Sequence, residues 1–204
     1  TEDKKKSTGK KSTDKKNTSK VKGKRVSLLK PITDLFAVDN NRMRWSFGSI
    51  FLLLAAYQIF SFLSYFFTWH SDQDKIINKG FFEFIFSDNE LIIDNHLGKL
   101  GAWISHVFIH EWFGIASFFF PFVLTILGFY LIFRIKMLPL KRTIAISTVS
   151  IVVLSLIFGF ITSNDSFPYG GEFGFQFNGW LKITVGTFGA FLFLVVIAFI
   201  AVVV

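Results

Sequence analysis

Four long apolar stretches divide the chain, and polar or charged segments separate them. The apolar stretches cover residues 45–69, 113–133, 143–161 and 181–204. A helix needs about 20 mostly apolar residues to cross a hydrocarbon core of about 30 Å, and each stretch is close to that length or longer. The pattern therefore predicts an all-α integral membrane protein with four transmembrane helices.

The flanks of the first stretch and one residue inside the second refine this prediction. Arg42 and Arg44 precede the first stretch, Trp45 and Trp69 mark its two ends, and no charged residue lies between the tryptophans. Tryptophan and arginine are typical anchors at the membrane surface. Pro121 lies within the second stretch, where it removes a backbone hydrogen bond and predicts a helix kink.

The polar segments differ in character. Residues 1–44 form a basic tail, and its first part, residues 1–24, is rich in Lys, Ser and Thr and is expected to be disordered. Residues 70–112 are mixed, residues 134–142 form a basic link, and residues 162–180 form a loop rich in Gly and aromatic side chains. The chain ends inside the fourth apolar stretch without a polar cap, so we expect a soluble region to follow it.

Charge alternates along these segments and predicts the orientation in the membrane. The tail holds 14 Lys and Arg against 5 Asp and Glu, a net charge of +9, and the segment of residues 70–112 carries −4. The link carries +4, and the last loop, with Lys182 at its edge, carries −1. Positive residues collect on the cytoplasmic side of a membrane. We therefore expect both termini in the cytoplasm, and residues 70–112 and 162–180 in the periplasm.

The basic tail has two possible roles. A block of this charge can contact anionic lipid or DNA. Charge runs are more often simply solvated, and that interpretation is favoured for residues 1–44.

A candidate metal site lies just before the second stretch. Helical spacing brings His106 and His110 onto one face, where a zinc ion could bind, and Glu111 follows directly. The metalloprotease pattern H-E-x-x-H places its glutamate between the two histidines instead, and no third ligand is evident here. Zinc binding is therefore disfavoured, and a pH-sensitive contact through either histidine is an alternative role.

The same segment has an amphipathic pattern. On a helical projection Lys99, His106 and His110 lie on one side. The opposite side holds Leu100, Trp103, Ile104, Val107, Phe108 and Trp112. Histidine and tryptophan suit the water–lipid boundary without any metal, so the pattern predicts an amphipathic interfacial helix before the second transmembrane helix.

The sequence carries no recognisable catalytic motif. It has no cysteine, no P-loop of the form G-x-x-x-x-G-K-[ST], no nucleophile elbow, and no acid or base in the interior of an apolar stretch. We therefore expect no catalytic residue, no metal and no cofactor in this segment, and we expect an anchoring and interaction role.

Seven glycines are candidates for turns or for close helix packing. They are Gly98 and Gly101 at the start of the amphipathic helix, Gly170, Gly171 and Gly174 in the last loop, and Gly186 and Gly189 in the fourth stretch. The last two lie three residues apart, a spacing that lets another helix approach closely. The general frequency of glycine in membrane helices explains that pair equally well.

Several of these residues carry a family resemblance. The stretch N-H-L-G-K-L-G-A-W from Asn95, the pair Phe113-Gly114, and Pro121 resemble the N-terminal membrane domain of FtsK/SpoIIIE-type DNA translocases. The segments G-G-E-F-G at 170–174 and G-T-F-G at 186–189 are similar to that family's last loop and last span. The resemblance covers residues 95–204 in detail and earlier residues only in layout.

The resemblance implies more than the residues themselves show. Members of this family connect the membrane domain to a cytoplasmic motor that forms hexameric rings, uses ATP and Mg, and pumps duplex DNA. The membrane domain anchors the motor at the division septum of the bacterial inner membrane and contacts other division proteins. No motor residue has a matching position in this sequence. The alternative is a non-enzymatic four-helix subunit of a membrane transport or secretion complex.

Overall fold

The described part of the protein is entirely helical. The computed structural model describes residues 41–77, 79–86, 91–134, 138–162 and 167–203, and these contain no strand. Four helical stretches are long and apolar enough to cross a membrane, at residues 41–76, 98–133, 140–161 and 171–203. The prediction of an all-α protein with four such helices is confirmed. Residues 1–40 of the predicted basic tail lie outside the described residues.

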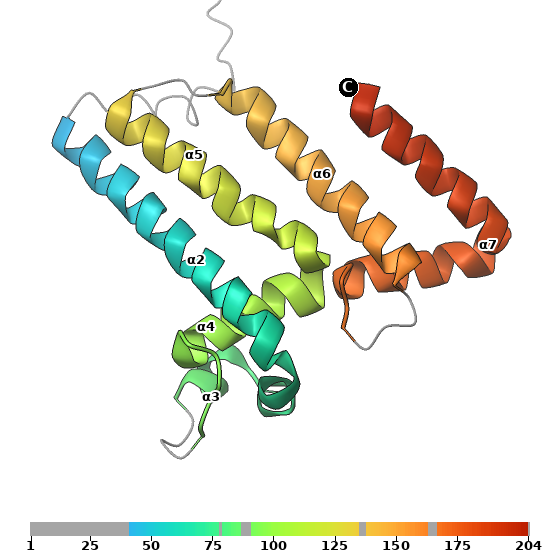
Figure 1. Ribbon diagram of the computed structural model, residues 1–204, viewed down its shortest axis with the longest axis horizontal. Helices are drawn as coiled ribbons and strands as arrows, with labels where there is room; N and C mark the ends of the chain where they lie inside the picture. The colour runs from blue at the N-terminus through green and yellow to red at the C-terminus, as the bar shows by residue number, and fades with distance from the viewer. Residues whose placement is uncertain (1–40, 78, 87–90, 135–137, 163–166, 204) are drawn as a thin grey trace, which may run out of the picture. The chain divides into compact units, whose positions relative to one another are not determined.

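The long helices lie side by side in the order α2, α5, α6 and the second part of α7 (Figure 1). The elements are α2 (Asn41–Ile76), α3 (Phe81–Ile85), α4 (Gly98–Ser105), the π-helix η1 (His106–Phe113), the 3₁₀-helix η2 (Gly114–Phe118), α5 (Phe119–Phe133), α6 (Leu140–Ile161) and α7 (Gly171–Val203).

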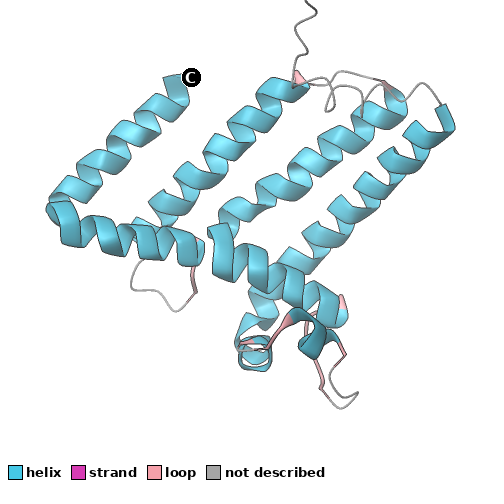
Figure 2. Ribbon diagram, turned by 180° about the vertical axis from the view of Figure 1, so that it is seen from behind, coloured by secondary structure: helices cyan, strands magenta, loops and turns pink. Residues whose placement is uncertain are grey.

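Two helical segments run across the ends of the long helices (Figure 2). The first transverse segment consists of α4 and η1, residues 98–113. The second is the part of α7 before Gly186, residues 171–185, because Gly186 interrupts that helix with φ 76° and ψ 166°. Each transverse segment follows one long helix and leads into the next. The described part therefore contains two repeats, residues 41–133 and residues 140–203, each with the order long helix, transverse segment, long helix, and α3 is an addition in the first.

The second transverse segment corrects one sequence expectation. The sequence predicts a Gly-rich loop at residues 162–180, but residues 171–180 are helical, and the turn into the last long helix lies at Gly186. The predicted fourth stretch therefore begins inside the transverse segment. The physical reason is that Gly171 and Gly174 serve close backbone contact, as described below, and glycine in a sequence does not distinguish this use from a loop.

Helix α2 is much longer than a membrane is thick. Its 36 residues extend about 54 Å at a rise of about 1.5 Å per residue, against a hydrocarbon core of about 30 Å. The end beyond Ser61 packs on η1 and, together with α3, on α4, in two apolar clusters. The buried members are Phe62, Tyr65, Ile109 and Phe167 in the first cluster, and Ile76, Phe84 and Ala102 in the second.

The first repeat is held together by close contact between α2 and α5. A Cβ on Gly48 would lie 2.6 Å from Ile132 Cγ1 and 3.1 Å from the Gly128 carbonyl oxygen, so the two backbones approach closely at these glycines. At the same end of the pair, Arg44 donates to the Leu131 carbonyl at 3.2 Å. Small residues at such a crossing let two membrane helices gain van der Waals contact.

Pro121 occupies the first turn of α5 and not the middle of a long helix. The preceding five residues are the 3₁₀-helix η2, and the chain changes direction before it, at Gly114, where φ is 65° and ψ is −141°. Proline is tolerated in a first turn because its missing N–H needs no partner there. The expected kink inside a continuous second span is therefore replaced by a turn at Gly114, seven residues upstream.

Candidate functional site

Four glycines with positive φ bracket the two transverse segments. Gly98 (φ 64°) and Gly171 (φ 68°) start them, and Gly114 (φ 65°) and Gly186 (φ 76°) end them. We call these four residues the hinge glycines. Backbone with φ in this range is disfavoured for side chains bearing a Cβ, so glycine is the residue that lets the chain turn at each point.

Two hinge glycines meet where the first transverse segment ends and the second begins. A Cβ on Gly114 would overlap the Tyr169 carbonyl oxygen, and a Cβ on Gly171 would overlap the Trp112 carbonyl oxygen. The Ile115 N–H donates to the Tyr169 carbonyl at 2.9 Å across the same contact. The two repeats are therefore joined here backbone to backbone, without room for a side chain on either glycine.

A buried serine fastens the long helix of each repeat to its transverse segment. Ser61 on α2 donates to the Gly101 carbonyl at 2.6 Å, and a Cβ on Gly101 would lie 3.2 Å from the Ser61 hydroxyl. Ser155 on α6 donates to the Gly170 carbonyl at 2.5 Å, and a Cβ on Gly174 would lie 2.9 Å from its hydroxyl. Both serines are fully buried. Hydroxyl bonds between helices are the usual polar contact of membrane bundles.

The chain leading into Gly98 is fixed to α2 by polar groups. The buried Asp72 carboxylate accepts from the backbone N–H groups of Asp94 at 2.8 Å and Asn95 at 2.9 Å. The Asn95 side-chain amide donates to the Ser61 carbonyl at 3.2 Å. The Tyr57 hydroxyl donates to the Leu97 carbonyl at 3.2 Å. These bonds explain the stretch that begins N-H-L-G, because several backbone groups of the turn have a partner on α2.

The other predicted glycines have different surroundings. Gly170 contacts α6 closely, since a Cβ there would overlap the backbone of Gly159. Gly186 has open space around its Cβ position, and the nearest atoms to a Cβ on Gly189 belong to Val185 of the same helix. In the described part no atom of another helix lies within 4 Å of a Cβ at either position, so their role in helix packing stays a prediction.

The sequence interpretation missed several residues that build these contacts. Gly114 was noted only in the family motif, and Gly159, Ser61 and Ser155 were not singled out. The available signal was the recurrence of a glycine, a second glycine three residues on, and a third after the helix. Serine within an apolar stretch gives no signal of its own, because its bonding partner is on another helix.

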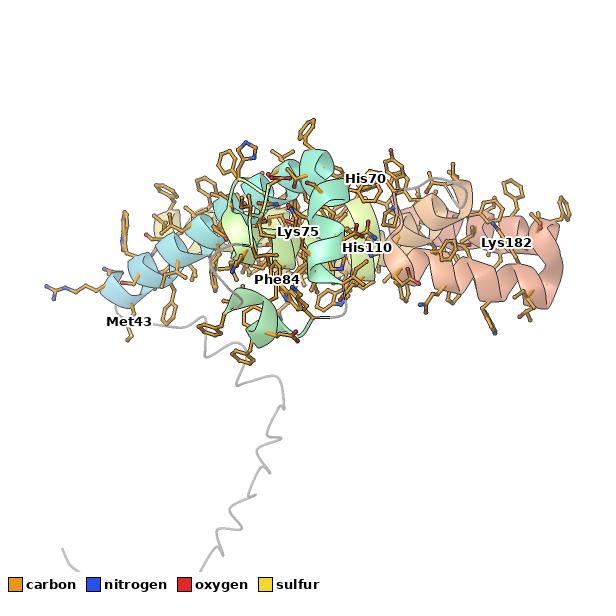
Figure 3. All side chains as sticks on the ribbon, turned by 90° about the horizontal axis from the view of Figure 1, so that it is seen from below. Met43, His70, Lys75, Phe84, His110 and Lys182 are labelled. Atoms are coloured by element: carbon orange, nitrogen blue, oxygen red, sulfur yellow. The ribbon has the colours of Figure 1, made fainter. Side chains whose placement is uncertain are left out.

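The two histidines are packed in the protein and do not form a metal site. His106 is only 3% exposed and its Nδ1 lies 3.2 Å from the Tyr65 hydroxyl. His110, labelled in Figure 3, has its Nε2 3.0 Å from the Gln73 amide on α2. Their rings stack with centroids 4.7 Å apart. Within the described residues no group of three or more His, Cys, Asp or Glu is placed to hold a metal.

The described part is thus a bundle of apolar helices that are joined at close glycine contacts. A family model of the 4TM region of DNA translocase FtsK/SpoIIIE matches residues 40–204. The chain belongs to this family. No curated protein and no solved structure matches it. The FtsK/SpoIIIE 4TM region is a membrane region and not a motor, which agrees with the helices described above.

Proposed function

We propose that this FtsK/SpoIIIE 4TM region anchors and oligomerises a DNA translocase at the division septum of the bacterial inner membrane. The proposal rests on the family match over residues 40–204, together with four helices able to span a membrane. The ATP- and Mg-dependent motor that pumps duplex DNA in chromosome segregation would follow C-terminally. Other division proteins would be partners of the membrane part, and hexamers its assembly.

Anchoring follows from the apolar surface of the long helices. Large apolar side chains are exposed along α2 and α7, among them Leu53 and Phe60 on α2 and Phe188 and Phe199 on α7. In water such a surface would cause aggregation, whereas lipid covers it favourably. A motor that pulls DNA exerts a reaction force on its mount, and four spanning helices resist extraction far better than a single lipid chain.

The alternating charge supports cytoplasmic termini. Arg44 and Arg134 lie at one end of the α2–α5 pair, where Arg134 donates to the Asn41 side chain at 2.6 Å. We infer that this end faces the cytoplasm, because positive residues collect there. The tail of residues 1–40 would then lie in the cytoplasm, where its lysines are solvated or contact anionic lipid or DNA.

Localisation of the complete protein tests this function. A fluorescent fusion at the native locus should collect at division sites, and deletion of residues 41–203 should release it into the cytoplasm and leave trapped chromosomes at septa. Even distribution around the envelope, with normal chromosome segregation after the deletion, would instead favour a subunit of a transport or secretion complex.

Cysteine accessibility tests the orientation, since the chain has no native cysteine. An impermeant maleimide added outside spheroplasts should label Asp74→Cys and Gln176→Cys, and should label Leu138→Cys only after permeabilisation. All three positions are exposed, so burial does not confound the comparison. The opposite labelling pattern would contradict cytoplasmic termini.

A further inference from the structure

The two repeats share a residue pattern as well as an order of elements. The first transverse segment has Gly98, Gly101, Ser105 and Gly114, and the second has Gly171, Gly174, Asn178 and Gly186. The spacing agrees except for one additional residue between Ser105 and Gly114. That residue falls where η1 is π-helical, and single-residue insertions into α-helices are commonly accommodated as π-helical turns.

Matching positions also make matching contacts. Ser105 donates to the Gly101 carbonyl at 2.8 Å, and the Asn178 side-chain amide donates to the Gly174 carbonyl at 2.7 Å. Ser61 and Ser155 lie against the second glycine of each segment, as described above. The two repeats are therefore equivalent in structure as well as in sequence pattern. A contact made by one repeat indicates which contact the equivalent residues of the other repeat can form.

The contact between the repeats joins the end of one transverse segment to the start of the other. Gly114 packs on Gly171, and beside them the Phe113 and Phe173 rings are 5.2 Å apart between centroids. Behind this contact, α5 lies against α6. We call this arrangement the repeat junction.

Each outer side of the described bundle carries a glycine that is equivalent to a packed glycine of the repeat junction but lacks its contact. Gly98 is equivalent to Gly171, and Gly186 is equivalent to Gly114, and both have open space around their Cβ positions. Val185 is 51% exposed, whereas its equivalent Phe113 is half-buried, and Leu100 is 44% exposed, close to the 39% of its equivalent Phe173. The start of the first transverse segment and the end of the second therefore each resemble one side of the repeat junction. The described part does not pair these two sides with each other.

We propose that a second copy of this chain completes the repeat junction. Gly186 of one copy packs on Gly98 of the next, Val185 packs on Leu100, and the part of α7 after Gly186 packs on α2 as α5 packs on α6. The inference deepens the oligomerisation stated under the proposed function and rests on it. Lipid could cover the apolar helix faces equally well, so the exposed faces alone decide nothing. The repeat junction favours a second copy as the partner, because it shows how the end of one transverse segment packs against the start of another.

The proposed contact is heterologous, since different surfaces of the two copies meet. Such contacts generate rings when the rotation between copies closes, and open filaments when it does not. Each added copy contributes two further repeats in the same direction. The assembly therefore needs no symmetry axis through the interface, which distinguishes it from a two-fold dimer.

Cross-linking in native membranes tests the contact with the full-length protein. Leu100→Cys and Val185→Cys are placed in two differently tagged copies, which are produced together and treated with a short bis-maleimide. The expected result is a shift to a mixed dimer that carries both tags. Either variant produced alone should stay monomeric, and both substitutions in one chain should give dimers and higher species.

A control pair within one chain shows that the protein is folded and that the reagent can bridge two thiols at such a junction. Phe113→Cys with Phe173→Cys occupies the equivalent positions within one chain, and should block both thiols without a dimer. Gln176→Cys, which is exposed but outside the junction, should give no mixed dimer when it is paired with Val185→Cys. The proposal would be overturned if the 113–173 pair within one chain reacts but Leu100→Cys and Val185→Cys give no mixed dimer. Dimers from either single variant would also overturn it. Continued collection of the fluorescent protein at septa in that case would leave the anchoring function standing.

Discussion

At the scale of single residues, positive φ and close backbone contact coincide at two of the four hinge glycines. Gly114 and Gly171 have φ values of 65° and 68°, and each lies against backbone atoms on the other side of the repeat junction. A flexible side chain can move aside for a new methyl group, but a hydrogen-bonded backbone cannot do so cheaply. These two positions should therefore be the least tolerant of substitution in the transverse segments.

Gly171→Ala tests this expectation. The free energy of unfolding should fall by at least about 2 kcal/mol, because positive φ in a residue with a Cβ costs about 1–3 kcal/mol and the methyl group also displaces the Trp112 carbonyl. Thermal unfolding of the purified protein in detergent measures the change. Gly179→Ala is the control, since that glycine lies in α7 with open space at its Cβ position. Equal loss in both variants would contradict the argument.

Asp72→Asn tests the polar attachment of the chain before Gly98. The buried carboxylate accepts two backbone N–H groups, and an amide offers one acceptor and one donor in their place. Local stability of residues 91–97 should fall by about 1–3 kcal/mol, the cost of a lost bond to a buried charged group. Hydrogen exchange of these residues measures it. The exposed Asp74→Asn should leave exchange unchanged, and protection retained in Asp72→Asn would rule out this role.

At the scale of elements, glycine crossings and buried serines hold the helices together. α2 crosses α5 at Gly48 and Gly128, and α6 meets the start of α7 where Gly159 lies against Gly174. Apolar helices gain little from leaving lipid for one another, so close van der Waals contact and a few hydrogen bonds must supply the association. The crossings are therefore where pairing of the long helices is decided.

Gly48→Leu should weaken the α2–α5 pair. Already a Cβ at this position would lie 2.6 Å from Ile132 Cγ1, so a full leucine side chain forces the helices apart. We expect a lower unfolding temperature in detergent and greater protease sensitivity of residues 91–97, which depend on α2. Ser46→Leu places the same side chain on the exposed face two residues earlier. If Ser46→Leu is as damaging as Gly48→Leu, the crossing is not the cause.

At the scale of the whole described unit, two repeats of similar construction meet through a junction that is largely backbone. The contacts between Gly114, Tyr169 and Gly171 are made by residues that lie outside the link. Each repeat has its own pair of long helices and its own buried serine. The junction should therefore hold the repeats together even when the chain is divided.

Division of the chain within the link tests this independence. Residues 1–136 and 137–204, produced together as separate chains, should copurify in mild detergent through the repeat junction. The same pair carrying Gly171→Leu should copurify much less, because the side chain overlaps the backbone around Trp112. Quantitative pull-down through a tag on either fragment measures the result, and independent elution of the unmodified fragments would refute the expectation.

The sequence by itself determined the four spanning helices and the all-α class. Length and apolar character are local properties, and hydrocarbon imposes them on each helix separately. The family resemblance, carried by the order of short motifs such as that from Asn95 to Trp103, was confirmed by the family match. Even the pairing of His106 with His110 followed from helical spacing, although their burial against α2 did not.

Only the tertiary structure decided how the glycines are used. In the sequence Gly171 and Gly174 indicate a loop, yet both belong to a helix. The sequence pattern misleads here because the backbone that approaches these glycines comes from residues far away in the chain. Ser61 and Ser155 are ordinary members of apolar stretches until their partners on the transverse segments are known. Close approach and hydrogen bonding are properties of pairs of segments. The residue pattern along one segment does not say which other segment it meets.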